Sequence, residues 1–334
     1  MKTLRTPDER FRDLPDFSFE PVYTEVPDGE GGTLRIHHID EGPRGGELVL
    51  CMHGQPTWSY LYRHMIPLLV ARGLRVVAPD LVGYGRSDKP AALEDYSYES
   101  QVAWLEAWLL ANDLRGATFV GQDWGGLIGL RLVTAQSDRF ARVCIANTAM
   151  PTPDPVGPER VEAVQRFRRE APTPSLPEVF GALSTPSETP ERQFAYWQKW
   201  CWETEDLPVG LSIAGILDGR TLGPAETAAY DAPFPEPRFK MGPRAMPSQV
   251  PTLGHEPSVA ANRRAWQVLE KWQKPFLCCF TDNDPVTAGR QREFLQRVPT
   301  ARERPISGGG HFLQEGRGRE FAELIADEIA ATSA

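Results

Sequence analysis

Residues 120–126 read Val-Gly-Gln-Asp-Trp-Gly-Gly and contain one carboxylate, that of Asp123, which could act as a nucleophile. An apolar run precedes this segment, and a helical pattern of apolar residues follows it. Gly121 and Gly125 flank Asp123, and glycine tolerates the strained strand-to-helix turn that pushes one side chain out over the edge of a sheet. The pattern predicts a nucleophile elbow, although taken alone it also fits a loop aspartate that caps a helix.

The identity of this residue decides the chemistry, because Asp123 occupies a position where many hydrolases carry Ser. An ionised carboxylate needs no base in order to attack, and it can displace a leaving group from an sp³ carbon to form an alkyl ester. Water must then hydrolyse that ester. The helix predicted to begin at Trp124 directs its N-terminus at Asp123 and favours a negative charge there.

A second segment, residues 51–56 (Cys-Met-His-Gly-Gln-Pro), ends the first strong apolar run. The loop after such a strand can supply one backbone N–H to an oxyanion hole. We expect the N–H of Gln55 to be that donor and the N–H of Trp124 to be the second. By itself, the His53-Gly54 pair also fits an ordinary exit from a strand.

An acid and a base follow later in the chain. Residues 280–286 (Phe-Thr-Asp-Asn-Asp-Pro-Val) put a carboxylate at a strand end, where it can orient a histidine. Asp284 is our choice, with Asp282 as the fallback, and the segment also has the composition of an Asx turn. His311 comes after three glycines, which cannot fill a core but let a loop approach a site. The order nucleophile, acid, histidine is that of an α/β-hydrolase.

The elements that must position these residues alternate between strands and helices. Short apolar runs of this kind suggest parallel strands buried on both faces, whereas residues 98–111, behind Ser97 as a possible N-cap, and residues near the C-terminus have helical spacing. The predicted fold is α/β, a mostly parallel doubly wound sheet. The predicted strands are residues 48–52, 75–78, 117–120, 142–146 and 275–280.

Two clusters of proline predict a division of the chain. One cluster follows Met150 and the other lies near residue 235, and proline resists both strand ladders and helix interiors. Between them lie helical pieces rich in aromatic residues. We therefore expect an inserted helical cap at residues 151–236, with the α/β core formed by residues 1–150 and 237–334.

Composition excludes several classes of function. The 334 residues are 41% hydrophobic and 24% charged, with a net charge of −9 and no cluster of Lys and Arg that would follow a phosphate backbone. No apolar run approaches the roughly 20 residues that span a bilayer. Charges near Met1 leave no apolar stretch for a secretory signal. We expect a cytoplasmic protein with no nucleic-acid or membrane partner.

The five cysteines predict no disulfide frame and no metal site. Most of them lie inside apolar runs, which indicates reduced, buried packing. The adjacent pair Cys278-Cys279 lacks the spacing and the nearby histidine that are typical of zinc ligands.

Taken together, these segments resemble the haloalkane dehalogenases of the α/β-hydrolase superfamily. The resemblance lies in HGQPTWSYLYR from His53, in GQDWGG, in TDNDP and in GGGHF, and it covers nearly the whole chain. It is closest to the subfamily whose catalytic acid follows the late strand. Asn147, at the end of the preceding strand, agrees with this, because another subfamily carries an acidic residue there.

The resemblance implies a reaction and a set of roles. Asp123 attacks a carbon that bears a halogen, and the halide leaves. His311, oriented by Asp284, then activates water against the ester, so that a halogenated alkane becomes an alcohol, a halide ion and a proton without metal or cofactor. Trp124 and Trp197 are implied to bind the halide, since an indole N–H is a donor without formal charge.

Some alternatives remain at this stage. Trp200 and Trp202 compete with Trp197, and any of these rings can simply pack the cap on the core. Gln55 departs from the acidic residue or Asn that is common at its position. If only its N–H matters, the glutamine is tolerated, whereas a side chain that holds water would tune the hydrolysis step. Substrate length, halogen preference and oligomeric state stay open.

Rival functions also follow from the same residues. An epoxide hydrolase uses the same Asp-His-Asp logic with cap tyrosines as acids, and Tyr196 and Tyr230 are available. Gln122 rather than His before the nucleophile resembles the dehalogenases instead. A fluoroacetate-type enzyme usually carries Arg where Trp124 stands. A binding protein with a hydrolase fold would have no need of the base His311.

Overall fold

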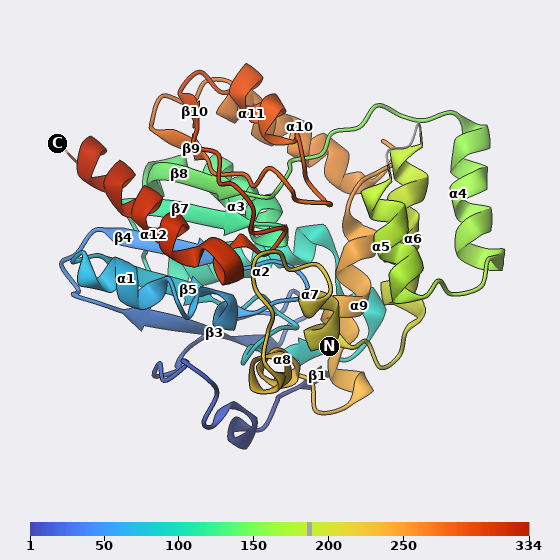
Figure 1. Ribbon diagram of the computed structural model, residues 1–334, viewed down its shortest axis with the longest axis horizontal. Coiled ribbons are helices and arrows are strands. Elements are labelled where there is room, and N and C mark those ends of the chain that lie inside the picture. Colours follow the sequence, from blue (N-terminus) through green and yellow to red (C-terminus); the bar gives the residue numbers. More distant parts are fainter. Residues whose placement is uncertain (186–188, 334) are drawn as a thin grey trace.

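An eight-stranded sheet forms the centre of the computed structural model, which describes residues 1–185 and 189–333 (Figure 1). The strand order is β10-β9-β8-β7-β4-β5-β3-β2. β2 and β3 run antiparallel to their neighbours, and all other pairs are parallel. The strands are β2 (Val22–Pro27), β3 (Thr33–Glu41), β4 (Leu48–Met52), β5 (Arg75–Pro79), β7 (Ala117–Gln122), β8 (Phe140–Ala146), β9 (Phe276–Cys278) and β10 (Ala301–Glu303). β1 (Thr3–Leu4) and β6 (Lys89–Pro90) pair separately.

The α/β fold and the predicted strands are confirmed, and the last of them is shorter than expected. β4 and β7 are buried along their whole length, as continuous apolar runs at the middle of a parallel sheet should be. Strands β2, β3 and β10 were not predicted. β3 carries Arg, Asp and two His among its nine residues, and β10 is largely exposed, so neither has an apolar run.

Helices cover both faces of the sheet (Figure 1). α1 and α12 contact each other in front of the sheet in this view, whereas α2, α3 and α10 form a chain of contacts behind it. α2 begins where it was predicted to, because the Ser97 hydroxyl accepts a hydrogen bond from the N–H of Ser100. The core helices are α1 (Ile66–Ala71), α2 (Tyr98–Ala111), α3 (Trp124–Ala135), α10 (Pro257–Leu269), α11 (Gln291–Arg297) and α12 (Leu313–Thr332).

Between β8 and β9, the described residues form helices and loops and no strand. α4, α5 and α6 lie beyond one end of the sheet (Figure 1), and α9 packs against α6 although it follows the second proline cluster. The cap boundary at residue 236 therefore stays a prediction. The helices are α4 (Pro158–Glu170), α5 (Leu176–Ser184), α6 (Pro190–Glu203), α7 (Val209–Ala214), α8 (Pro224–Asp231) and α9 (Met241–Ala245).

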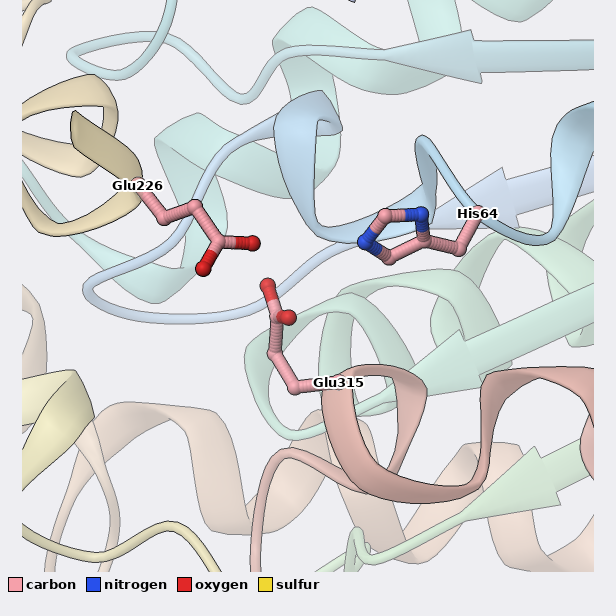
Figure 2. A group of neighbouring side chains, drawn as sticks. All are labelled: His64, Glu226 and Glu315. Carbon is pink, nitrogen blue, oxygen red and sulfur yellow. The ribbon is translucent and has the colours of Figure 1, made fainter. Parts of the chain in front are cut away.

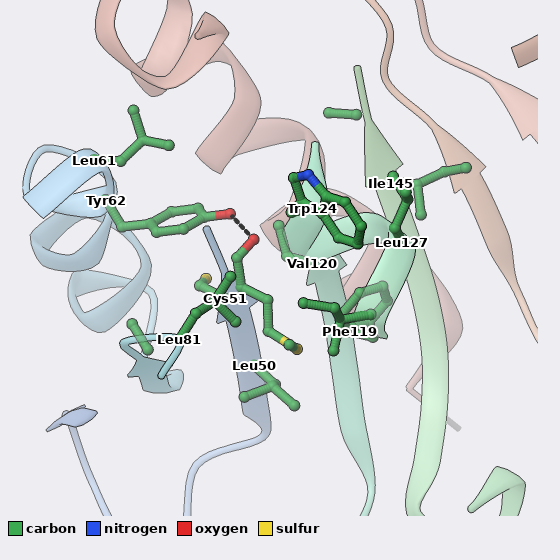
Figure 3. Packing of buried hydrophobic residues seen from close by; sticks show 14 of the residues in the cluster. Leu50, Cys51, Leu61, Tyr62, Leu81, Phe119, Val120, Trp124, Leu127 and Ile145 are labelled. Atoms are coloured by element: carbon green, nitrogen blue, oxygen red, sulfur yellow. Dashed lines mark hydrogen bonds between the residues drawn. The ribbon is translucent and has the colours of Figure 1, made fainter. Parts of the chain in front are cut away.

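Buried apolar side chains pack beneath the end of β7. Figure 3 shows Leu50 and Cys51 of β4 beside Phe119 of β7, with Leu127 of α3 against the same cluster. The Tyr62 hydroxyl donates a hydrogen bond of 2.9 Å to the carbonyl of Met52, which ends β4. Packing and hydrogen bonding thus fix the ends of the two central strands.

Two further findings concern the cysteines and the search for a membrane-spanning helix. All five cysteines are free and buried. Among residues 1–185 and 189–333, no helix is both long enough and apolar enough to cross a bilayer.

The central strands should carry much of the stability. Leu50 is 0% exposed, so Leu50→Ala should cost about 2–5 kcal/mol of unfolding free energy through lost burial and a residual cavity. Leu211→Ala on α7, where the side chain is 61% exposed, should change it by no more than about 0.5 kcal/mol. Urea unfolding of both variants measures the difference, and equal losses would contradict this picture of the core.

Candidate active site

Asp123 lies between the end of β7 and the start of α3, in a strained turn. Its φ is 49° and its ψ is −129°, a backbone conformation that residues other than glycine rarely adopt. The turn is held by its neighbours, since the Asp123 N–H donates to the Asn147 carbonyl at 3.0 Å and the Thr148 hydroxyl donates to the Asp123 carbonyl at 2.8 Å. The predicted elbow is therefore present.

Glycines are required around this turn by close approach. A Cβ on Gly125 would lie 2.0 Å from the Met52 carbonyl oxygen, and a Cβ on Gly54 would lie 2.2 Å from Oδ1 of Asp123. Both contacts are far shorter than real Cβ atoms tolerate. The strand-exit segment with Gly54 and the elbow with Gly125 therefore pack directly against each other.

The backbone of Gln55 reaches the nucleophile as predicted. Its N–H donates to Oδ1 of Asp123 at 2.7 Å. Trp124 is the first residue of α3, so its N–H belongs to the amides that a helix leaves unpaired at its N-terminus. The Gln55 side chain donates from Nε2 to the Pro243 carbonyl at 2.9 Å. That amide nitrogen is therefore engaged by the protein backbone.

His311 contacts both predicted carboxylates. Its Nε2 lies 3.5 Å from Oδ2 of Asp123, and its Nδ1 lies 3.0 Å from Oδ1 of Asp284. Asp284 is buried and also accepts from the N–H groups of Val286 and Thr287, at 2.8 and 3.1 Å. Asp282, the fallback, is exposed and binds the Ser307–Gly308 turn instead. The geometry selects Asp284.

The charges around His311 control its protonation. Burial alone would lower the pKa of its imidazole, but the charge of Asp284 and the hydrogen bonds and charge of Asp123 outweigh burial and raise the pKa to about 10. Burial also opposes ionisation of Asp284, yet the charge of His311 and the hydrogen bonds described above keep the pKa of Asp284 below its usual value. Asp284 and Asp123 therefore favour the protonated form of His311.

Gln122 and Asn147 hold the backbone of His311, a role that was not predicted from the sequence. Nε2 of Gln122 donates to the His311 carbonyl at 3.1 Å, and Nδ2 of Asn147 donates to the same oxygen at 3.0 Å and to the Gly310 carbonyl at 2.8 Å. Both residues stand where a central strand ends, which is the signal that could have identified them.

His53 contributes structure rather than chemistry. Its Nδ1 lies 2.9 Å from the Gly54 carbonyl, and its Nε2 accepts from the Leu81 N–H at 2.9 Å. Both ring nitrogens are therefore used to shape the strand exit that carries Gln55.

A cavity of about 780 Å³ opens over Asp123. Gln55, Trp124, Trp197 and His311 line it together with Asp123, and most of the remaining wall is apolar. Trp197 stacks on Trp200, with ring centroids 5.3 Å apart.

The competing aromatic residues lie outside the cavity wall. Trp200 and Trp202 are absent from its lining, as are the tyrosines Tyr196 and Tyr230. Tyr196 packs on Phe167, with centroids 4.6 Å apart, and the Tyr230 hydroxyl donates to the buried carboxylate of Glu315. Neither tyrosine is placed to protonate a ligand beside Asp123.

The chain is similar to known proteins over nearly its whole length. Residues 47–317 match the family model described as the alpha/beta hydrolase fold. The chain is 43% identical to a haloalkane dehalogenase of Psychrobacter cryohalolentis over 333 residues, which is 98% of each protein. It is 40% identical to a haloalkane dehalogenase of Mycobacterium marinum over 328 residues, covering 97% of this chain and 99% of the relative.

The chain is also similar to a solved structure. A tetrameric haloalkane dehalogenase from Paraglaciecola agarilytica NO2 superposes with a TM-score of 0.78 and 31% identity, covering 99% of both chains.

The raised pKa of His311 predicts how stability changes with pH. The folded protein keeps this proton up to about pH 10, whereas an unfolded histidine releases it near 6.5. The contribution is therefore complete below about 6.5 and is lost as the pH rises towards 10. Urea unfolding over this interval should show a steeper fall for the wild type than for His311→Gln, and parallel curves would argue against the assignment.

Proposed function

The chain belongs to the haloalkane dehalogenases, hydrolases with the α/β-hydrolase fold, and from this premise we propose how its residues divide the reaction. Asp123 is the nucleophile, His311 the base, and Asp284 the acid that orients His311. One observation supports this most directly: Asp123 lies 3.5 Å from a histidine that is paired with a buried carboxylate, in the floor of a largely apolar cavity.

In the first step, an oxygen of Asp123 attacks the carbon that bears chlorine, bromine or iodine. The new C–O bond forms as the carbon–halogen bond breaks, and the halide departs with the bonding electrons. Trp124 and Trp197 line the same cavity, and their indole N–H groups are the donors that stabilise the developing anion. They carry no formal charge, so they can release the halide afterwards.

In the second step, His311 takes a proton from water, which attacks the ester carbonyl. The N–H groups of Gln55 and Trp124 hold the oxyanion, and the Gln55 N–H already donates to Oδ1 of Asp123. Collapse of the tetrahedral intermediate releases the alcohol and restores the carboxylate. The products are an alcohol, a halide ion and a proton.

The charge of Asp123 couples the protonation of His311 to the progress of the reaction. Before attack, the Asp123 carboxylate helps to hold the proton on His311. Esterification removes that negative charge, so the pKa of His311 falls and the imidazole can lose its proton. His311 thus becomes a base when there is an ester to hydrolyse.

The epoxide hydrolase alternative is not favoured. It needs an acid beside the nucleophile to protonate the opening oxygen, and Tyr196 and Tyr230 lie outside the cavity lining. A binding protein would need neither the Asp284–His311 pair nor the elbow.

Two further proposals concern the whole chain. We assign residues 151–236 to a cap that supplies Trp197 and closes the cavity over the core. We also assign the protein to the cytoplasm, which the five free cysteines support because a reducing compartment keeps thiols unpaired.

Purified protein should release halide and protons from a short brominated alkane, and Asp123→Ala should release neither. His311→Gln should slow steady turnover about 100- to 10,000-fold, because the base is lost while the nucleophile remains. It should release halide once and keep the alkyl group on Asp123. Halide assays and intact-protein mass spectrometry measure these outcomes.

A matched pair of variants tests the acid. Asp284→Asn should lose turnover, whereas Asp282→Asn should keep it, since only Asp284 contacts His311.

A simple epoxide assayed in parallel should give no diol. Turnover that survives in Asp123→Ala, or diol without halide, would sink the proposed function.

Halide binding should depend on Trp197 and not on its helical neighbour. Trp197→Phe removes one donor to an anion, worth about 1.5–3 kcal/mol, so bromide should inhibit turnover about 10- to 100-fold more weakly. Trp202→Phe changes the same helix outside the cavity and should leave inhibition unaltered. Inhibition constants for added bromide compare the two variants, and equal values would remove Trp197 from the halide site.

A further inference from the structure

A second cluster of charges lies outside the cavity and centres on Glu315, in the first turn of α12. Its side chain is 0% exposed, and both carboxylate oxygens accept from the Arg63 guanidinium, Oε2 at 3.0 Å. The Tyr230 hydroxyl donates to Oε1. The proposed mechanism uses none of these groups.

The cluster continues towards the cap through Glu226. Arg63 also donates to Glu226 at 3.0 Å, and Arg220 pairs with both Glu226 and Glu315, the latter at 3.1 Å. Figure 2 shows Glu315 and Glu226 with their carboxylates towards each other and His64 close by. These three residues have the spacing of metal ligands, but Arg63 and Arg220 already neutralise both carboxylates, so we assign no metal here.

The partners of Glu315 come from three separate parts of the chain. Arg63 directly follows the 3₁₀ helix Ser59–Tyr62, on the segment that leaves β4 through Gln55. Tyr230 and Glu226 belong to α8, within the proposed cap. Glu315 itself lies in the turn that follows His311, because its N–H donates to the Phe312 carbonyl at 3.0 Å. One carboxylate therefore joins the segments of the base, the oxyanion donor and the cap.

Net stability is a weak explanation for such a cluster. Removing charges from water costs several kcal/mol per ion, and well-packed apolar residues often replace a buried ion pair at little cost. Apolar packing, however, is not directional and would not fix the orientation of the joined segments relative to one another. Glu315 accepts directional hydrogen bonds from Arg63 and Tyr230, and Arg63 also lies over the Tyr60 ring, 3.9 Å from its centroid.

We propose that Glu315 is a positioning residue: through Arg63 and Tyr230 it fixes the start of α12, and with it His311, relative to the ester on Asp123. The proposal rests on the proposed function. His311 acts only in hydrolysis of the ester, so a misplaced imidazole should slow the second step and spare the first. A purely structural role for Glu315 would lower thermal stability without separating the two steps.

Rapid mixing with excess bromoalkane separates the steps, because the halide burst reports alkylation and the steady rate reports hydrolysis. In Glu315→Gln, hydrolysis should slow about tenfold while alkylation stays within about twofold, as expected for a small displacement of a catalytic group. Glu328→Gln is the control, since it removes an acid of the same helix that pairs with Arg302. It should leave both rates unchanged.

Tyr230→Phe covers the case in which Glu315→Gln does not fold, because it removes one hydroxyl and leaves the Arg63 ion pair intact. It should slow hydrolysis about threefold with an unchanged burst, in line with the loss of one hydrogen bond. A folded Tyr230→Phe with wild-type hydrolysis, or with both steps slowed alike, would overturn the proposal. A wild type without a halide burst or turnover would instead refute the function itself.

Discussion

The strained turn at Asp123 is the constraint on which the rest of the site depends. A residue with φ of 49° persists only where its surroundings hold it. Here two central strands, the start of α3, the Asn147 carbonyl and the Thr148 hydroxyl do so. Gly54 and Gly125 leave no room for a side chain. The same packing that forces the turn also brings the Gln55 N–H onto the carboxylate. The same close packing therefore strains the backbone of Asp123 and positions the Gln55 N–H before the reaction begins.

His311 is fixed by opposite means, through polar contacts on a glycine loop. Asp284 binds its ring, Gln122 and Asn147 bind its carbonyl, and Glu315 anchors the helix that follows. Burial would strip a lone imidazole of its proton, but two carboxylates reverse that preference. In the proposed reaction, esterification of Asp123 removes one of these negative charges until hydrolysis restores it, so the electrostatics of the site change at the moment when a base is needed.

Much of this arrangement could be predicted from the sequence, and the exceptions have physical reasons. β4 and β7 were readable because they are continuous apolar runs, and Asp123 because glycines flank it. β3 was missed because His37 and His38 are buried only by virtue of distant partners, Asp80 and Trp108. Spacing could not separate Asp284 from Asp282, since only the folded loop decides which one faces His311. The place of Tyr230 likewise depended on a partner in another segment.

The cavity is lined both by the α/β core and by the segment between β8 and β9. Asp123, Asp284 and His311 all lie on the α/β core, while Trp197 and much of the apolar lining come from the helices and loops between β8 and β9. Substitutions in the inserted helices can reshape the room offered to a substrate while the reacting groups keep their support from the sheet. Under the proposed function, the range of substrates can therefore change through substitutions between β8 and β9 that leave Asp123, Asp284 and His311 in place.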